Sequence, residues 1–222
     1  MGLYLKGFLI ACKGSPATVG VSLFAIVLGA LVGLLVAFAR MNKNKLLRGV
    51  GTVYVEMIRG TPMIVQALLM AYGIPQLLQS AGIGFKWPEL VIPAMLVCGI
   101  NSSAYMAEVI RSGLQAVDKG QVEAARSLGM PQKMAMRLVI IPQAIRIILP
   151  AFCNEFVTLI KETSVLSFVG VIEITRRGAL WNSQSFETFP AYIGVALAYM
   201  ILTIPLSKAV GWYEKKMQRK EA

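Results

Sequence analysis

Two glutamates in an otherwise apolar stretch are the residues whose spacing suggests chemistry most directly. Glu155 and Glu162 are seven residues apart, which is two turns of an α-helix, so a helix here places both on one face. Thr158 lies between them, three residues after the first and four before the second. Carboxylate and hydroxyl groups in this pattern can bind an ammonium group or a basic side chain. We therefore predict a polar solute path along this face, with Glu162 as the main contact.

Other polar side chains extend the predicted path. Asn154, Lys161 and Thr163 border the glutamate face, and Gln66 and Asn101 interrupt two other apolar stretches. An ionised group at membrane depth costs on the order of 3 kcal/mol or more, so it usually faces a cavity or a partner. The alternative is a structural network in which Lys161 and the glutamates satisfy one another, while the other polar groups hold helices together.

The composition argues against covalent catalysis. The chain has no histidine, which removes the commonest general base and metal ligand. Its three cysteines, Cys12, Cys98 and Cys153, are far apart and lack the spacing of a metal site or a disulfide framework. We predict no catalytic residue, no bound metal and no cofactor in this chain.

The elements that must position the polar residues are membrane-spanning helices. The chain has 222 residues, of which 56% are hydrophobic and 15% are charged, whereas about 25% is usual for a soluble domain. The apolar residues form long uncharged runs, and a run of roughly 18 or more can cross a bilayer as a helix. We predict a single all-α polytopic domain whose five spans cover approximately 17–39, 52–78, 89–109, 147–171 and 189–210.

The first span has no convincing cleavage site and its charges lie on the wrong side for a signal peptide, so it is predicted to be retained. Residues 1–16 are expected to form a short external amphipathic segment, and the first span is expected to begin near Ser15 and Pro16. Gly29 and Gly33 are four residues apart, which favours close approach to another helix.

The basic residues indicate an orientation. The net charge is +11, and 15 of the 22 lysines and arginines lie in 40–48, 111–146 and 208–220. The positive-inside rule places these segments in the cytoplasm, with the N-terminus outside and the C-terminus inside. The excess charge is therefore explained by topology, with anionic lipid and a cytoplasmic protein as contacts rather than nucleic acid.

Charged pairs and aromatic residues mark the ends of the predicted spans. Glu56 and Arg59, and likewise Glu108 and Arg111, are three residues apart, a spacing that permits an ion pair on one helix face. We predict that they are gate or structural pairs. The three tryptophans, Trp87, Trp181 and Trp212, are predicted to be interface anchors.

The segment 111–146 is too charged to cross the membrane and contains its own helix start and stop signals. Residues 123–128 favour a helix, Gly129 suits the position after a helix end, and Pro131 suits the start of a second helix. The small residues Ala124 and Ala125 leave room for another protein to approach. A plain solvated connection is the alternative, although connections are usually much shorter.

This segment resembles the EAA loop of ABC-importer permeases. The matching residues are Glu123-Ala124-Ala125, Gly129 four residues later, and Val139-x-Ile141-Pro142, where the family has isoleucine and leucine at the first two positions of the last motif. The resemblance extends over nearly the whole chain. The segments that are similar to polar amino-acid permeases of this family are Tyr54-x-Glu56-x-x-Arg59-Gly60-Thr61-Pro62 with Gln66, Ala104-Tyr105-x-Ala107-Glu108, Pro142-Gln143-Ala144 and Lys161-Glu162-Thr163-Ser164.

The resemblance implies the type I ABC-importer permease fold in the bacterial inner membrane. It implies that the short helix inserts into a groove of a cytoplasmic ATPase, with Glu123, Ala124, Ala125, Leu128 and Gly129 in contact. It also implies two such ATPases that bind ATP and Mg²⁺, a second permease subunit, identical or homologous, and an extracytoplasmic solute-binding protein. The chain has no phosphate-binding loop of its own. The implied function is import of a polar amino acid by alternating access.

Two other functions fit parts of the sequence. A stand-alone transporter driven by an ion gradient would use the carboxylates as ion or proton sites, but five spans without a repeat fit it poorly. An intramembrane enzyme lacks any spaced catalytic pair.

Overall fold

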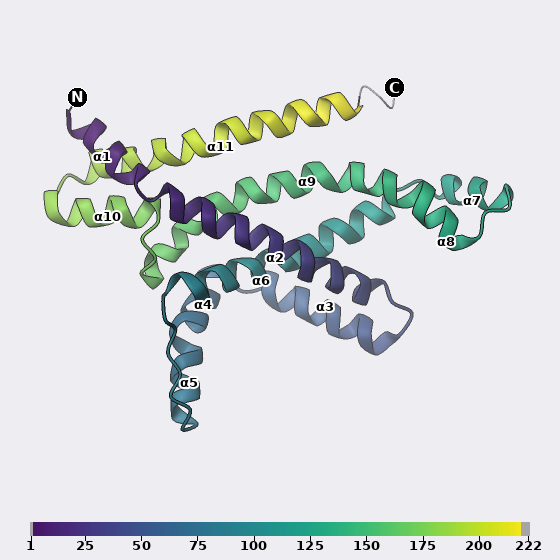
Figure 1. Ribbon diagram of the computed structural model, residues 1–222, viewed down its shortest axis with the longest axis horizontal. Coiled ribbons are helices and arrows are strands. Elements are labelled where there is room, and N and C mark those ends of the chain that lie inside the picture. Colours follow the sequence, from purple (N-terminus) through teal and green to yellow (C-terminus); the bar gives the residue numbers. More distant parts are fainter. Residues whose placement is uncertain (1, 219–222) are drawn as a thin grey trace.

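Every regular element in residues 2–218, the part of the chain that the computed structural model describes, is helical (Figure 1). Arg219 and Lys220 of the predicted basic tail lie outside the described residues. In chain order the elements are α1 (Gly2–Cys12), α2 (Ser15–Met41), α3 (Lys45–Arg59), α4 (Met63–Leu68), the π-helical turn η1 (Leu69–Gly73), α5 (Ile74–Ser80), α6 (Val91–Gln115), α7 (Lys119–Ser127), α8 (Gln132–Ala135), the π-helical turn η2 (Met136–Ile140), α9 (Ile141–Glu162), the 3₁₀ segment η3 (Thr163–Val169), α10 (Ile174–Ser185) and α11 (Thr188–Gln218).

The centre of the molecule is the packing of α2 along α6, with α9 beside them. A Cβ added at Gly33 would lie 2.6 Å from the Cβ of Met106, and one added at Gly29 would lie 2.8 Å from Ser102 Oγ. Both distances are too short for real atoms, so the two helices approach as closely as they do because these positions are glycine. The close approach predicted from the glycine spacing is confirmed.

One end of the bundle is closed by α1, α10 and the first part of α11 (Figure 1). Trp181 of α10 is only 7% exposed, and its ring lies next to Gly7 of α1. The prediction that Trp181 anchors the protein at the membrane interface is therefore wrong, because the indole fills the joint between α10 and α1. Trp212, by contrast, is 64% exposed.

The N-terminal segment also differs from the prediction. Helices α1 and α2 together form a 40-residue apolar unit over Gly2–Met41, which is longer than the predicted first span. Leucines project on several sides of α1, at Leu3, Leu5 and Leu9, so this helix is not amphipathic in the way that was expected of an external segment. Helix α2 does begin at Ser15, with Pro16 in its first turn.

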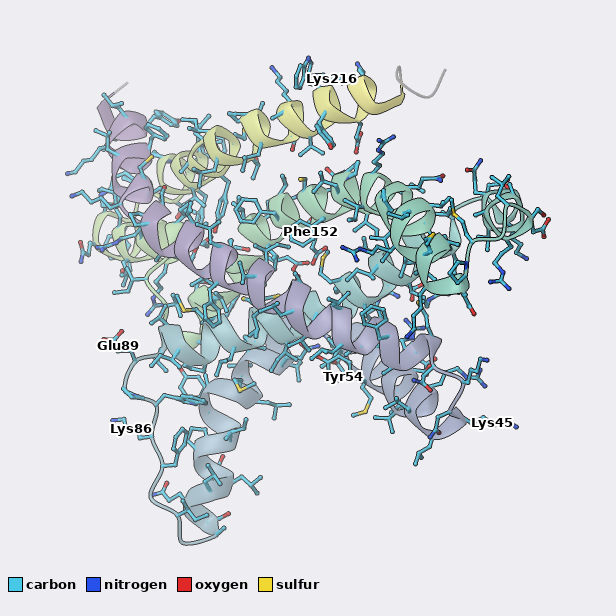
Figure 2. All side chains as sticks on the ribbon, turned by 45° about the vertical axis from the view of Figure 1, so that its right-hand side comes forward. Lys45, Tyr54, Lys86, Glu89, Phe152 and Lys216 are labelled. Carbon is cyan, nitrogen blue, oxygen red and sulfur yellow. The ribbon has the colours of Figure 1, made fainter. Side chains whose placement is uncertain are left out.

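The region predicted as the second span is strongly bent. Helix α3 and the following helices over Met63–Ser80 meet at an angle of 100°, at Gly60, Thr61 and Pro62. Proline has no N–H to continue the helix and restricts the residue before it, which explains the break. As a result α4 packs against α6 and η3, and the chain continues through η1 into α5 as an arm that projects away from the bundle (Figure 1). Lys86 and Glu89 lie on the segment that returns from this arm to α6 (Figure 2).

The opposite end of the bundle carries α7 and α8 (Figure 1). Helix α6 continues to Gln115, beyond the predicted limit of the third span, and α7 and a tight turn follow. From Gln132 to Val169 the chain is one 38-residue helical unit, so the second helix of the predicted loop is the start of the fourth span.

Within the described residues, three helical units are long and apolar enough to cross a membrane, and the bent pair makes a fourth. Helix α6 has 25 residues, about 37 Å at the usual rise per residue. Its polar residues at 101–103, 108 and 111 lower its mean hydropathy, and it is not among the units counted above.

Candidate translocation path and coupling segment

Helix α9 directs one of its two glutamates at α6. Ser102 Oγ donates to Glu155 Oε1 at 3.2 Å, and Ser102 is fully buried where α2 crosses α6. The predicted position of Glu155 inside the bundle is consistent with this contact. Ser102 is next to the predicted path residue Asn101 in an apolar helix, and this position is the sequence signal that marks it.

Gln66 and Asn101 come together, but they also stabilise the bend. Asn101 Nδ2 donates to Gln66 Oε1 at 3.0 Å. The Gln66 amide donates to the carbonyl oxygen of Ile58 at 2.8 Å and to the hydroxyl of Thr61 at 2.8 Å. These acceptors belong to the last turn of α3 and to the break, so Gln66 satisfies groups that the interrupted helix leaves without partners.

Glu162 is half-buried at the end of α9 and differs from Glu155 in its contacts. Within residues 2–216 it forms no hydrogen bond and no ion pair, and Lys161 next to it is exposed. The alternative in which Lys161 pairs with the glutamates is therefore not what the structure contains. Thr163 is buried and donates to the carbonyl oxygen of Ile160 at 2.8 Å, where α9 tightens into η3.

Asn154 does not extend the polar face as predicted. Asn154 Nδ2 donates to Glu214 Oε1 of α11 at 3.3 Å, so this amide turns away from α6. Thr158 Oγ1 donates to the carbonyl oxygen of Asn154 in its own helix at 3.1 Å. The side chains on α9 are thus divided between two neighbours, α6 and α11.

Tyr54 and Ser103 form a polar contact that the sequence did not identify. The hydroxyls of Tyr54 on α3 and Ser103 on α6 are 2.6 Å apart, and Ser103 is fully buried. Tyr54 is part of a family-like motif in the sequence, but no role was predicted for it. A tyrosine that faces an apolar helix usually finds a hydrogen-bond partner for its hydroxyl.

The predicted pair of Glu56 and Arg59 is wrong. The ion pairs within residues 2–216 involve Glu108, and Glu56 is exposed. The guanidinium carbon of Arg59 instead lies 5.2 Å from the centroid of the Tyr105 ring, a cation–π distance. The last turn of α3 is therefore held to α6 by an aromatic ring instead of a carboxylate.

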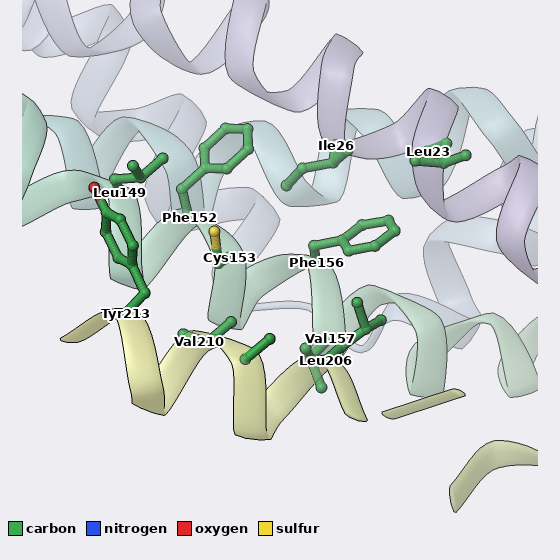
Figure 3. A pocket seen from close by; sticks show the side chains of 11 residues that line it. Leu23, Ile26, Leu149, Phe152, Cys153, Phe156, Val157, Leu206, Val210 and Tyr213 are labelled. Carbon is green, nitrogen blue, oxygen red and sulfur yellow. The ribbon is translucent and has the colours of Figure 1, made fainter. Parts of the chain in front are cut away.

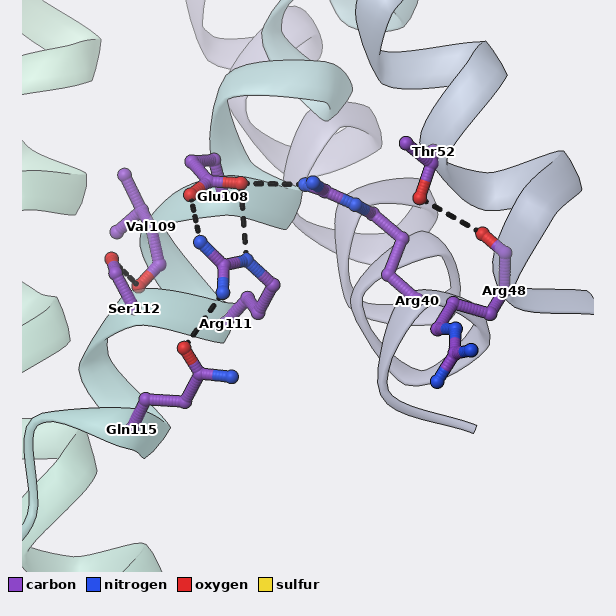
Figure 4. A network of polar contacts seen from close by, with 8 residues as sticks. All are labelled: Arg40, Arg48, Thr52, Glu108, Val109, Arg111, Ser112 and Gln115. Atoms are coloured by element: carbon purple, nitrogen blue, oxygen red, sulfur yellow. Dashed lines mark hydrogen bonds and ion pairs between the residues drawn. The ribbon is translucent and has the colours of Figure 1, made fainter. Parts of the chain in front are cut away.

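The predicted pair of Glu108 and Arg111 is confirmed, and a third residue joins it. Glu108 pairs with Arg111 in the same helix, and Arg40 at the end of α2 lies 2.5 Å from Glu108 Oε2 (Figure 4). Arg111 also donates to Gln115 Oε1 at 2.6 Å. This network ties the ends of α2 and α6 together at the start of the segment 111–146, called the coupling segment after its predicted role.

A buried carboxylate joins three segments at the other end of the bundle. Glu173 caps α10, where its oxygens accept the backbone N–H groups of Thr175 and Arg176, each at 2.7 Å, and the hydroxyl of Tyr199 on α11, also at 2.7 Å. Burial raises the pKa of Glu173, and these hydrogen bonds oppose the rise. This residue was not identified from the sequence, and its contact with Tyr199, 26 residues away, has no local signal.

The coupling segment has the predicted helix and turn. Asp118 caps α7 by accepting the Gly120 N–H at 2.6 Å, and Gly129 has φ +81° after the helix end. The N–H of Gly129 bonds to the carbonyl of Arg126 at 3.0 Å and that of Met130 to the carbonyl of Ala125 at 3.1 Å. This pair of bonds is a Schellman motif.

The surface of this segment is only partly as expected. Glu123, Ala124 and Gly129 are exposed and Leu128 is 81% exposed. Ala125 is only 5% exposed, so the prediction that it contacts a partner is wrong: its methyl group faces the bundle. Leu128 projects from a short, capped helix at the end of the bundle, where a protein partner could cover it.

The cavity between α2, α9 and α11 does not belong to a polar path. It has a volume of about 480 Å³ and is lined by apolar side chains such as Phe152, Phe156 and Leu206 (Figure 3). The polar contact of α9 with Ser102 lies instead on the side of this helix that faces α6.

Comparisons with known proteins agree with this arrangement. Residues 25–219 match the family described as "Binding-protein-dependent transport system inner membrane component". The chain is 35% identical to a putative glutamine transport system permease protein GlnP of Rickettsia conorii, over 96% of this chain and 95% of that protein. It is 36% identical to a probable glutamine ABC transporter permease protein GlnM of Bacillus subtilis, over 99% and 98%.

Two solved structures have similar folds. A crystal structure of an amino acid ABC transporter with histidines is 40% identical to this chain and has a TM-score of 0.87, with 96% of each chain covered. An inward-facing structure of the MetNI methionine ABC transporter is 20% identical, with a TM-score of 0.69 and coverage of 98% and 97%. The second likeness concerns the fold alone. On the match over residues 25–219, this chain belongs to the family of inner membrane components of binding-protein-dependent transport systems.

Proposed function

We propose that this chain is the transmembrane permease subunit of an ABC importer that moves a polar amino acid into the cytoplasm. The observation that carries the proposal is α7, a short capped helix with an exposed leucine, held at one end of a polytopic helical bundle. The family match and the glutamine and amino-acid permeases among the relatives support it.

The partners follow from the same reasoning. A cytoplasmic ATPase binds α7 and supplies ATP hydrolysis, with ATP and Mg²⁺ held by that subunit and not by this chain. An extracytoplasmic solute-binding protein delivers the amino acid. The complete importer contains two ATPases and two permease subunits, identical or homologous.

Five spans cross the inner membrane, with the N-terminus outside and the C-terminus in the cytoplasm. The end of the bundle with α7 then faces the cytoplasm, which agrees with its basic residues. Single cysteines at Lys45 and Lys86, which lie far apart (Figure 2), test this in a variant without the native cysteines. An impermeant thiol reagent outside the cell should label position 86 and leave position 45 unlabelled, and the reverse pattern would overturn the orientation.

The mechanism is alternating access. Because the helical unit from Gln132 to Val169 is continuous and begins directly after the turn at Gly129, a displacement of α7 moves the cytoplasmic end of the same unit that carries Glu155 and Glu162. A helical unit of 38 residues is about 57 Å long, which is enough to connect the ATPase to the polar path.

The solute contact is Glu162. It is half-buried and has no partner within the described residues, so its carboxylate is available to the ammonium group of an amino acid. Glu155, Asn101 and Gln66 form the polar wall on the side of α6 and α4. Thr158 and Thr163 each donate to a carbonyl oxygen of their own helix, and Asn154 lies off this wall.

Reconstitution tests the function. Vesicles that contain the permease, its ATPase and its binding protein should take up labelled glutamine only with ATP on the ATPase side, and uptake should persist when ionophores remove ion gradients. Uptake that needs no ATPase and stops with the gradient would support a secondary transporter instead.

The coupling helix is tested within the same system. Changing Glu123→Lys together with Ala124→Trp alters two exposed positions of α7 and should prevent stable association with the ATPase. Glu187→Lys, near the opposite end of the molecule, is the control and should leave association unchanged. A fully associated double variant would refute the assignment of α7 as the contact.

A further inference from the structure

A polar cavity of about 510 Å³ lies between the ends of α2 and α6 and the start of α3, next to the network of Glu108. The residues that line it are Arg40, Met41, Arg48, Thr52, Arg111 and Gln115. Three of the six are arginines and none is acidic, so the cavity suits an anion.

The positive charge of this cavity is only partly compensated. Glu108 pairs with both Arg40 and Arg111 (Figure 4), so one carboxylate serves two guanidinium groups. Arg48 has no ion pair within residues 2–216, and the buried Nε of Arg40 has no hydrogen-bond partner. Two positive charges therefore remain for a bound anion, together with a buried donor.

An apolar groove continues from this cavity. It has a volume of about 570 Å³, shares Met41 and Gln115 with the polar cavity, and is lined by side chains of α2, α6 and α9 such as Leu34, Ile110 and Ile148. A site with a cationic pocket at one end and an apolar groove at the other fits an amphipathic anion better than a free inorganic ion.

We propose that this composite site binds an anionic phospholipid of the inner leaflet, with its phosphate among the three arginines and one acyl chain in the groove. Guanidinium groups bind phosphate through paired hydrogen bonds, and basic pockets between membrane helices on the cytoplasmic side bind anionic headgroups. The location in the inner leaflet rests on the proposed orientation.

The site also borders the coupling segment. Val117 and Val122, just before and within α7, line the far part of the groove. A bound acyl chain therefore packs against the base of α7, so that occupancy by lipid and the position of the coupling helix are linked.

Native mass spectrometry of the permease assembled with its ATPase tests the proposal. The complex is equilibrated with equal amounts of dioleoyl phosphatidylglycerol and dioleoyl phosphatidylcholine, which differ in net charge but not in acyl chains. We expect phosphatidylglycerol to be retained in preference, and Arg48→Gln to lower its retention about fivefold, the effect of one basic residue at an anionic lipid. Arg48 is chosen because its loss breaks no ion pair within residues 2–216.

Two further variants distinguish lipid binding at this site from a general effect of positive charge on the protein surface. Arg146→Gln removes an exposed arginine of α9 that lines neither cavity, and should leave retention within about twofold of the unmodified complex. Leu34→Trp enlarges a groove side chain that is 41% exposed, and should reduce retention of phosphatidylglycerol by excluding the acyl chain. Equal losses for Arg48→Gln and Arg146→Gln would overturn the proposal.

Other occupants give distinct results. If millimolar inorganic phosphate displaces phosphatidylglycerol, or if Leu34→Trp has no effect, the cavity is an anion site without a lipid and the proposal fails. If a photo-crosslinker at Met41 attaches to a second permease or to the ATPase instead of to lipid, a protein covers the site and the proposal also fails. None of these measurements depends on uptake, so they leave the proposed function standing.

Discussion

Glu108 and Glu162 are both half-buried carboxylates near the end of a long helix, yet their surroundings are opposite. Glu108 has two guanidinium groups within ion-pair distance, while Glu162 has no hydrogen-bond or ion-pair partner within residues 2–216. The first carboxylate connects two helices of the same chain, and the second is available to something that is not part of the chain. The paired carboxylate holds the bundle together, whereas the unpaired one is the proposed solute contact.

The largest effect is expected at Glu108. In Glu108→Gln the guanidinium groups of Arg40 and Arg111 lose their shared carboxylate, and the free energy of unfolding should fall by about 2 kcal/mol because two partly buried charges lose their partner. Thermal unfolding in nanodiscs measures this as a lower Tm. The control Glu89→Gln, at an exposed glutamate before α6, should leave Tm unchanged. An unaltered Tm for Glu108→Gln would mean that this network is not structural.

Glu162→Gln should do the reverse and affect transport without affecting stability. Loss of one charge-assisted hydrogen bond to the solute ammonium should lower glutamine uptake by about tenfold, while Tm stays the same. Uptake by the reconstituted importer and thermal unfolding are measured on the same sample, with Glu187→Gln as the control. Unchanged uptake kinetics would remove Glu162 from the path, and a lower Tm would place it in the same class as Glu108.

The turn after α7 offers a smaller effect at a third location. Gly129 has φ +81°, and a Cβ at this position would meet nothing within 4 Å, so Gly129→Ala brings backbone strain of about 1 kcal/mol without a clash. We expect several-fold weaker stimulation of ATP hydrolysis by the loaded binding protein. Gly84→Ala, also in open space but without positive φ, is the matched control. Normal stimulation in Gly129→Ala would show that the turn geometry is not needed for coupling.

Glu56→Gln is the smallest expected effect. Glu56 is exposed and has no ion pair within residues 2–216, so stability should change by less than about 0.5 kcal/mol and uptake should remain within about twofold. A loss of stability comparable to that of Glu108→Gln would instead indicate that Glu56 does pair with Arg59 in the assembled importer, as the sequence predicted.

The sequence predicted those parts of the fold that depend on local signals. Apolar run lengths indicated an all-helical protein with helices long enough to cross a membrane, although not the count of five or the bounds. Gly129 with Pro131 located the turn after α7, because helix ends are determined by residues close in the chain. The bend at Gly60 to Pro62 has a local signal too. Its 100° angle was not predicted, and the contact of Gln66 beside the bend with Asn101, 35 residues later, has no signal in the local sequence.

The candidate site was less predictable because its contacts are between distant residues. Helical spacing placed Asn154 next to the glutamate face, but its partner is Glu214, 60 residues later. Arg40 reaches Glu108 across 68 residues, and no periodicity within one helix reveals such a pair. Ala125 matched the family motif and still faces inward, since a motif gives residue types but not which side of a short helix the bundle covers.

The indole of Trp87 provides a consequence for spectroscopy. Its N–H donates to the carbonyl oxygen of Met70 at 2.9 Å, beside the π-helical turn of the arm, and the phenyl ring of Phe85 lies edge-on with its centroid 4.9 Å away. With Trp181→Phe and Trp212→Phe, Trp87 remains as a single emitting indole. Because indole emission depends on hydrogen bonding and on exposure to water, its wavelength then shows whether the surroundings of the arm change during transport, without any attached dye.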